Sequence, residues 1–192
     1  DETVLGHRAY RAVEDLPEAP DLALIVIPSE HVIPTIDSLG KLGTRYAIII
    51  TAGFKETGEK GKSMERELLE TARKYGMRFV GPNCMGIVNT AIALNTTVVE
   101  LRDRPGHLGF ASQSGTYITQ SLKYLGKRGI RFSKALSVGN EADINIVDAL
   151  EYLGEDEQTR AISLYIEGIR DVPRFIEVAR RITPHMPVGA QY

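Results

Sequence analysis

The sequence predicts an α/β protein made of two parallel-sheet units in series. Short apolar runs alternate with helical patterns along most of its 192 residues. Several runs are apolar throughout, which is typical of parallel strands covered on both faces. An irregular stretch at residues 81–106 interrupts the alternation before it resumes. Because alternating units of this size build parallel sheets with helices on both faces, we expect two domains, residues 1–104 and 105–192.

In the first unit, the continuous apolar run at residues 22–27 predicts a buried strand. Ser29 follows it and can cap a helix that extends to about residue 39. Gly76 is placed to end a later helix, since glycine readily adopts the left-handed conformation found there. The remaining elements expected in this unit are a strand at 46–50, a helix at 62–75 and a short strand at 77–80.

The second unit follows a linker or tight turn that we expect at residues 102–106. Apolar side chains at three- and four-residue spacing, as at Ile118, Leu122 and Leu125, indicate helices with one buried face. Pro187 and Val188 can begin one further strand. The strands are expected at 108–111, 132–138 and 161–166, and the helices at 114–125, 145–153 and 172–182.

Composition and charge argue against several classes of function. The chain is 43% hydrophobic and 25% charged, which is typical of a soluble globular protein. Its net charge of −2 gives no general attraction to nucleic acid or to an anionic membrane. No apolar run approaches the roughly 20 residues of a membrane span. Cys84 is the only cysteine, so no intrachain disulfide can form, and we expect a reducing, cytoplasmic location.

The familiar metal, nucleotide and hydrolase motifs are missing from the sequence. The four histidines are scattered and Cys84 has no Cys or His at ligand spacing, so we expect no metal site. Neither a P-loop nor a G-x-G-x-x-G motif is present. Gln113 stands two residues before Gly115, where a nucleophile elbow would need a serine, so a serine hydrolase is not expected.

Candidate binding residues follow the predicted strands. In open α/β sheets, ligands bind beyond the carboxyl ends of the strands. That rule selects Pro28-Ser29, Thr51-Ala52-Gly53, Gly81-Pro82-Asn83-Cys84, Ser112-Gln113-Ser114, Gly139-Asn140 and Glu167-Gly168.

The most informative of these segments is the corner at residues 107–116. An apolar stretch ends in Ser112-Gln113-Ser114-Gly115-Thr116, and a helical pattern then opens. The first amides of a helix lack internal partners and carry partial positive charge, so such a corner can hold a phosphoryl group. Ordinary capping also favours Ser and Thr at these positions, so an anion site and a structural cap are both open at this point.

Two further residues have a chemical and a structural interpretation. Glu167 follows a predicted strand, where its carboxylate could orient a histidine, accept a proton or merely cap the next helix. Cys84 could be a nucleophile, but a lone cysteine without an evident base is more often a small packed residue.

Taken together, three ordered motifs resemble a known superfamily. They are Gly81-Pro82-Asn83-Cys84-Met85-Gly86-Ile87, Ser112-Gln113-Ser114-Gly115-Thr116 and Glu167-Gly168. The resemblance is to the α-subunit side of the succinyl-CoA synthetase superfamily, and more closely to the NDP-forming acetyl-CoA or acyl-CoA synthetases. It spans nearly the whole chain. It implies a partial Rossmann-like CoA-binding unit followed by a flavodoxin-like unit of the succinyl-CoA synthetase type.

The resemblance also implies a reaction. Members of the family interconvert acyl-CoA, nucleoside diphosphate and phosphate with acid, nucleoside triphosphate and CoA, through an acyl phosphate and a phosphohistidine. Mapped onto this sequence, Ile50, Thr51 and Ala52 match a strand end that touches CoA, and Asn83 and Cys84 match the loop beside the thioester. Ser112, Ser114, Gly115 and Thr116 match the helix start that cradles the phosphoryl group. Glu167 matches the acid that hydrogen-bonds the phosphorylated histidine.

Several family parts have no counterpart in these 192 residues. They are the glycine-rich loop that grips the CoA phosphates, the loop with the nucleophilic histidine, and the ATP-grasp domain. The chain thus resembles the middle of a larger enzyme or subunit, and we expect it to be inactive alone. The resemblance implies CoA as a ligand, with ATP/ADP or GTP/GDP and Mg²⁺ on the ATP-grasp part. It also implies an acid or acyl-CoA substrate, an ATP-grasp domain or β subunit as partner, and a homo- or hetero-oligomer.

Other functions stay open at the level of sequence. CoA-binding regions of this kind also occur fused to protein acetyltransferases, where they act as sensors or scaffolds without ligase chemistry. The fold alone would also allow a flavodoxin-like FMN binder. The residues that follow Tyr192 would discriminate the first two, because a histidine in a Gly/Ser-rich loop supports the ligase. The identity of the acyl group depends on side-chain shape that the sequence does not reveal.

Overall fold

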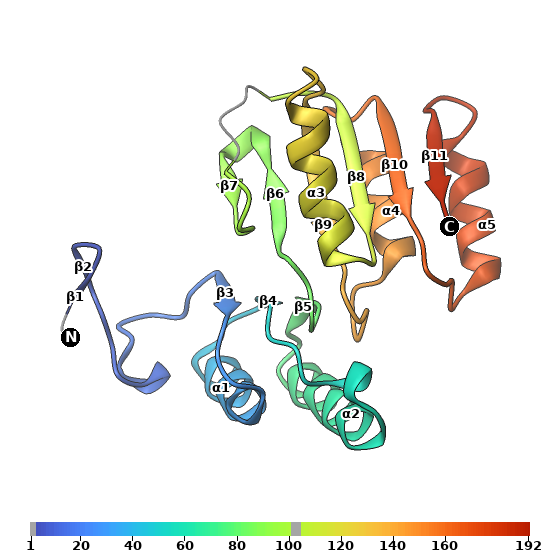
Figure 1. Ribbon diagram of the computed structural model, residues 1–192. Helices are drawn as coiled ribbons and strands as arrows, with labels where there is room; N and C mark the ends of the chain where they lie inside the picture. Colours follow the sequence, from blue (N-terminus) through green and yellow to red (C-terminus); the bar gives the residue numbers. More distant parts are fainter. Residues whose placement is uncertain (1–2, 101–104) are drawn as a thin grey trace.

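A computed structural model describes residues 3–100 and 105–192 of the chain. The expected linker at residues 102–106 falls largely on residues 101–104, as does the expected domain boundary, so both lie outside the described residues. A small antiparallel hairpin, β1 (Thr3–Val4) with β2 (His7–Arg8), stands apart at the amino-terminal end (Figure 1). Two larger sheets follow it.

The first unit is built on a three-stranded parallel sheet. Its order is β3 (Leu22–Ile25), β4 (Tyr46–Ile49) and β5 (Arg78–Val80). α1 (Ser29–Leu42) and α2 (Glu59–Lys74) connect the strands and lie together on one side of the sheet (Figure 1). The short 3-10 helices η1 (Val13–Asp15) and η2 (Lys55–Thr57) complete the unit.

The two faces of this first sheet are covered differently. Ala23 and Ile25 point toward α1 and α2 and belong to the core beneath the sheet. On the opposite face, Ile48 packs with residues of the second unit, whereas Leu24 is 46% exposed. The expectation of helices on both faces is therefore wrong for the described part of this unit. The periodicity of each strand is the same whether helices or a neighbouring unit cover its second face.

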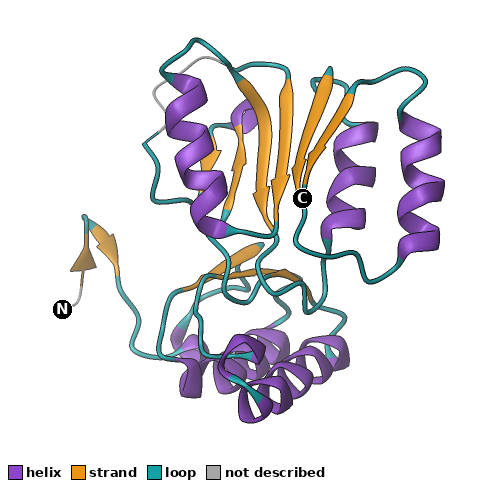
Figure 2. Ribbon diagram, turned by 45° about the vertical axis from the view of Figure 1, so that its right-hand side comes forward, coloured by secondary structure: helices purple, strands orange, loops and turns teal. Residues whose placement is uncertain are grey.

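The second unit is built on a six-stranded sheet with the order β11-β10-β8-β9-β6-β7. α3 (Gly115–Gly126) lies against one face, and α4 (Ile146–Glu155) and α5 (Val172–Ile182) lie against the other (Figure 2). The strands that form parallel pairs are β8 (Leu108–Ser112), β9 (Phe132–Ser137), β10 (Ala161–Tyr165) and β11 (Val188–Gln191).

Two short strands in the irregular stretch belong to the second sheet. β6 (Ile87–Asn89) pairs antiparallel with β9, and β7 (Leu94–Asn95) pairs antiparallel with β6 after the 3-10 helix η3 (Thr90–Ile92). The sheet is therefore mixed at this edge rather than parallel throughout. Strands of three and two residues leave no periodicity in a sequence, which is why this stretch reads as irregular.

Candidate active site between the two units

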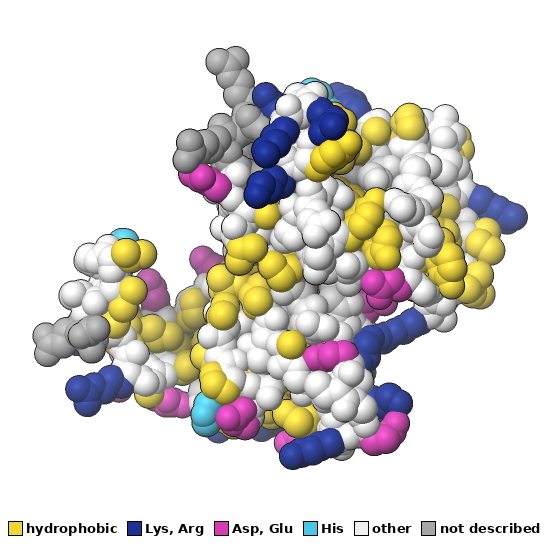
Figure 3. Space-filling model, in the orientation of Figure 1, with side chains coloured by type: hydrophobic (Ala, Val, Ile, Leu, Met, Phe, Trp, Pro, Cys, Tyr) yellow, Lys and Arg dark blue, Asp and Glu magenta, His cyan; other side chains and the backbone are white. Residues whose placement is uncertain are grey.

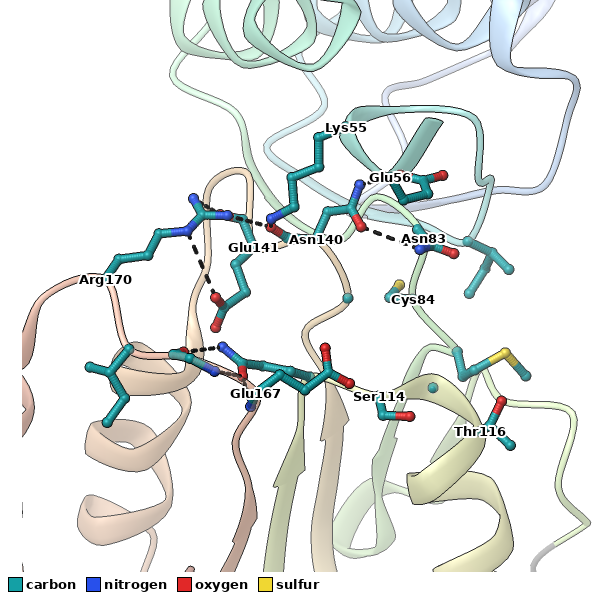
Figure 4. Close-up of a pocket in the computed structure, with 17 residues that line it drawn as sticks. Lys55, Glu56, Asn83, Cys84, Ser114, Thr116, Asn140, Glu141, Glu167 and Arg170 are labelled. Atoms are coloured by element: carbon teal, nitrogen blue, oxygen red, sulfur yellow. Dashed lines mark hydrogen bonds and ion pairs between the residues drawn. The ribbon is translucent and has the colours of Figure 1, made fainter. Parts of the chain in front are cut away.

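A cavity of about 720 Å³ lies where the two units meet. The loops that follow the strands of both sheets line it, as expected for ligand sites in α/β sheets. The 81–87 loop and the 112–116 corner both reach this cavity, which confirms that they face one cleft. The lining consists of Ile50, Lys55, Glu56, Asn83, Cys84, Met85, Gln113, Ser114, Gly115, Thr116, Gly139, Asn140, Glu141, Glu167, Gly168, Ile169 and Arg170 (Figure 4).

The start of α3 forms one side of the cavity. Ser114 is the N-cap of this helix, and its Oγ accepts a hydrogen bond of 3.3 Å from the amide of Tyr117. Ser114, Gly115 and Thr116 all line the cavity. Because the first amides of a helix lack internal partners, the helix presents donors and partial positive charge to this space. The corner therefore has the features of an anion site, and anion binding there stays a prediction.

Ser112 does not share this position. It is fully buried, its Oγ donates to the carbonyl of Ser114 at 2.7 Å, and it accepts from the amide of Ser114 at 3.1 Å. It is also not among the residues that line the cavity. The expected direct contact between the Ser112 hydroxyl and a phosphoryl group does not fit this geometry. The side chain instead fixes the turn that leads into α3.

Of the residues expected on the CoA side, some line the cavity and others lie outside it. Ile50, Asn83 and Cys84 line the cavity. Thr51 turns its Oγ1 away to Ile27, donating to the carbonyl at 2.7 Å and accepting from the amide at 3.2 Å. Thr51 thus ties the ends of β4 and β3 together, and Ala52 is exposed outside the lining.

Cys84 is a packed residue in this structure. It is 2% exposed, and its Sγ donates to the carbonyl of Ile49 at 3.3 Å. Burial raises the pKa of the thiol to about 11. A thiol with such a pKa is almost fully protonated near neutral pH, so the structure favours the packing interpretation over the nucleophile.

Glu167 lines the cavity from the loop between β10 and α5. It is exposed, and its side chain extends toward the side of the pocket where Ser114 lies (Figure 4). The neighbouring backbone is held by Gln113, whose Oε1 accepts from the amides of Glu167 and Gly168, the latter at 3.0 Å. The carboxylate and the helix start therefore share the same part of the cavity lining.

A polar network at the other end of the cavity was not predicted. Asn140 is its centre: Nδ2 donates to Oε2 of Glu56 at 2.6 Å and to Oε2 of Glu65 at 2.8 Å. Its Oδ1 accepts from Nδ2 of Asn83 at 3.2 Å. Since Asn140 belongs to the second unit and its partners to the first, its side chain joins the two (Figure 4).

Two cations converge on the backbone of the same residue. The carbonyl of Asn140 accepts from Lys55 Nζ and from Arg170 Nη2, the latter at 2.7 Å. Acidic and basic side chains also lie side by side on the surface where the units meet (Figure 3). Residues 139–140 were selected by their strand-end position, but Lys55 and Arg170 stand several residues beyond their strands, where sequence gives no such signal.

Charge and backbone geometry are perturbed at this end of the cavity. Burial raises the pKa of the Glu141 carboxyl, against hydrogen bonds from the Ile146 amide and Gln113. Burial and then the charge of Arg170 lower the pKa of Lys55. Glu141 and Asn83 adopt positive φ values of 58° and 55°. Non-glycine residues in this conformation tend to cluster at functional sites, where the surrounding contacts hold them.

Neither a metal site nor a membrane-spanning helix is found within residues 3–100 and 105–192. No group of three or more His, Cys, Asp or Glu side chains there is placed to hold a metal ion. None of the helices in the same residues is both long and apolar enough to cross a membrane.

Comparison with known proteins identifies the two halves of the chain. The family model described as a CoA binding domain matches residues 1–90, and that described as a succinyl-CoA ligase like flavodoxin domain matches residues 105–190. The chain is 47% identical over 190 residues to the acetate–CoA ligase [ADP-forming] II subunit alpha of Pyrococcus furiosus. Over nearly its whole length, the chain is similar to a subunit of an ADP-forming acyl-CoA synthetase.

Other synthetases and solved structures agree in fold. The chain is 41% identical over 185 residues to acetate–CoA ligase [ADP-forming] I of Archaeoglobus fulgidus. The crystal structure of PH0766 from Pyrococcus horikoshii matches 99% of the chain with a TM-score of 0.93 and 46% identity. A Ca. Korarchaeum cryptofilum dinucleotide forming acetyl-coenzyme A synthetase 1, in complex with phosphate and ADP, matches with the same TM-score and 36% identity.

The chain corresponds to part of these synthetases. The match to the Pyrococcus furiosus subunit includes 99% of this chain but 41% of that subunit. The match to the Archaeoglobus fulgidus ligase includes 27% of that ligase. This chain covers 43% of the Pyrococcus horikoshii chain and 41% of the Ca. Korarchaeum one. The two curated relatives are named as ligases, and neither supports the acetyltransferase-linked sensor.

Proposed function

We propose that this chain forms the CoA-side and phosphoryl-side part of an NDP-forming acyl-CoA synthetase. In this reaction, acid, CoA and nucleoside triphosphate give acyl-CoA, nucleoside diphosphate and phosphate, by way of an acyl phosphate and a phosphohistidine. One observation carries the proposal: a single cavity brings together the 81–87 loop, the start of α3 and Glu167. Transfer of an acyl group from phosphate to a thiol needs both sites within reach of one substrate.

The proposal assigns roles to the residues around the cavity. Ser114, Gly115 and Thr116 hold the phosphoryl oxygens through the start of α3. Ser112 acts indirectly, because its hydroxyl shapes the turn before the helix. Glu167 accepts a hydrogen bond from the histidine that carries the phosphoryl group, which fixes the tautomer of that ring.

The thiol side of the cavity takes the reactive end of CoA. Ile50, Asn83 and Cys84 supply its walls, and Cys84 contributes as a packed side chain rather than as a nucleophile. Thr51 and Ala52 shape the end of β4 from outside the cavity.

The proposal extends to parts outside these residues. The phosphorylated histidine is carried by a loop outside these residues, and a nucleotide with Mg²⁺ binds to an ATP-grasp domain or a partner subunit. Two relatives of this chain are named as alpha subunits, which supports an assembly with a second subunit. We also propose a cytoplasmic location for the protein. Because the chain has only part of the machinery, we expect that the 192 residues make no acyl-CoA when purified alone.

The experiment is phosphate labelling of the intact protein that contains this chain. Glu167→Gln removes the anionic partner of the imidazole, and we expect it to slow phosphoenzyme formation by about 10²–10³-fold. Ser114→Ala is expected to weaken phosphate binding while CoA binding stays nearly unchanged. If these residues only cap helices, each change lowers stability by about 1 kcal/mol and labelling per folded molecule stays normal. Normal labelling in both variants contradicts the proposal.

A further inference from the structure

The side chain of Gln113 bridges two loops of the second unit. Gln113 follows β8 directly, and its amide donates to the carbonyl of Tyr165 at 3.2 Å, which extends the pairing of β8 with β10. Its carboxamide then reaches the loop after β10. Oε1 accepts from the amides of Glu167 and Gly168, and Nε2 donates to the carbonyl of Gly168 at 2.7 Å.

These bonds replace a missing stretch of strand. The parallel register of β8 and β10 ends at the pair Ser112 and Tyr165. Beyond it, the carboxamide of Gln113 offers one acceptor and one donor, as a peptide group would, to the backbone of Glu167 and Gly168. Both of these residues are exposed, and a Cβ on Gly168 would meet no atom within 4 Å. Side-chain packing therefore does little to hold these two residues, whereas Ile169 next to them packs against the core.

We propose that Gln113 is a positioning residue that aims the carboxylate of Glu167 into the cavity. The inference rests on the proposed function, in which Glu167 holds the phosphorylated histidine. Because a carboxylate displaced by about 1 Å can cost on the order of 100-fold in rate, an exposed loop needs such a restraint. Gln113 touches the backbone on both sides of the Glu167–Gly168 peptide, so it fixes where the Glu167 side chain starts.

The chemistry of the position calls for a glutamine. The side chain of Gln113 also lowers the pKa of Glu141, whose carboxylate lines the same cavity, against the larger effect of burial. Glutamate would keep the acceptor for the two amides but lose the bond donated to Gly168 and add a charge beside Glu141 and Glu167. Asparagine is one methylene shorter, and methionine matches the length without any hydrogen bond.

The test compares Gln113→Met with a matched control in the intact protein. Gln120→Met makes the same exchange at an exposed position of α3. Two measurements are made: hydrogen–deuterium exchange of the peptide around residues 166–170, and the rate of phosphoenzyme formation. We expect Gln113→Met to speed exchange in this peptide and to slow labelling about tenfold or more, with KM for CoA unchanged. Gln113→Glu, which keeps the acceptor, recovers part of the exchange protection. Gln120→Met changes neither measurement.

A double-mutant cycle with Glu167→Gln shows whether Gln113 acts through Glu167. If it does, Gln113→Met causes no further loss of labelling in the Glu167→Gln protein. Additive losses, or normal labelling in Gln113→Met, overturn the inference and leave the proposed function intact. Normal labelling in Glu167→Gln overturns the role of Glu167 in the proposed function, and the inference with it.

Discussion

Ser112 and Ser114 show how much the environment of a residue decides its role. They are two positions apart and chemically identical, and both precede the same helix. Ser112 is the last residue of β8, and its hydroxyl forms hydrogen bonds with the backbone of Ser114. Ser114 caps α3 at the edge of the cavity. The sequence indicated the corner before α3 as a possible anion site. It could not show which of the two serines faces the cavity, since that depends on the direction of each side chain.

Cys84 should resist thiol reagents in the folded protein. With its pKa raised by burial from 9.0 to about 11, the thiolate fraction at pH 8 falls roughly 100-fold relative to an exposed thiol. Cys84 is the only cysteine, so reaction with a chromogenic disulfide at pH 8 reports on it alone. We expect slow reaction in native buffer and rapid reaction in denaturant, and equal rates would contradict the burial.

The same pKa shift predicts how stability depends on pH. Because the folded pKa lies above the unfolded value, the unfolded thiol ionises first as the pH rises. Its contribution to folding stability is therefore complete below about pH 9 and declines between about pH 9 and 11. Urea unfolding across this range should show a smaller loss of stability in Cys84→Ala than in the parent protein.

Gly115 should tolerate no larger residue while Met85 is present. A Cβ at Gly115 would lie 2.4 Å from Cγ of Met85, so the side chain must move. Gly115→Ala is expected to cost about 1–3 kcal/mol in unfolding free energy, as overpacking does. Met85→Ala combined with Gly115→Ala should recover part of this loss, and a purely additive result would show that Met85 is not the obstacle.

At the scale of elements, the sequence predicted most of what the structure shows. The expected strands and the five helices appear with bounds that differ by a few residues, because each carries a clear apolar pattern. The helix expected from residue 62 instead begins at Glu59, because its first turn carries no apolar signal. β6 and β7 were missed, because β6 depends on pairing with the distant strand β9 and β7 has only two residues.

The start of α4 offers a test of local stability. Asn145 caps the helix, accepting from the amides of Val147 and Asp148 at 2.8 and 3.1 Å, and Oδ2 of Asp148 accepts from the amide of Asn145 at 2.9 Å. Asn145→Ala removes this capping box and should lower the unfolding free energy by about 1 kcal/mol. Asn145→Ser keeps a capping oxygen and serves as the control, and an equal loss in both variants would contradict the capping role.

At the scale of the whole molecule, the site depends on how the two units meet. The backbone contributes directly: the amide of Asn140 donates to the carbonyl of Pro82 at 2.9 Å, and that of Ala142 to Gly81 at 3.1 Å. Gly139 allows this approach, because a Cβ there would lie 2.4 Å from the carbonyl oxygen of Pro82. Sequence patterns describe single elements, so the meeting of Lys55 and Arg170 at Asn140 could not be predicted from them.

Asn140 should therefore matter to the stability of both units. Asn140→Ala leaves the buried carboxylate of Glu65 without the 2.8 Å bond from Nδ2, and we expect a loss of about 1–3 kcal/mol. Hydrogen–deuterium exchange should rise on both sides of the junction, in the 53–58 segment of the first unit and the 139–144 segment of the second. Gln120→Ala is the exposed control. A rise confined to the second unit would show that the side chain does not couple the units.

The place of β6 has a consequence for how the chain folds during synthesis. β3, β4 and β5 are complete once residue 80 has left the ribosome, so the first sheet can form early. β6 follows at once, but its partner β9 is made only after β8 and α3. Until then, the amides and carbonyls of β6 that will face β9 have no strand to pair with. Pairing over such a distance along the chain is slow and prone to aggregation. We infer that closure of β6 on β9 is a late step that joins the two units.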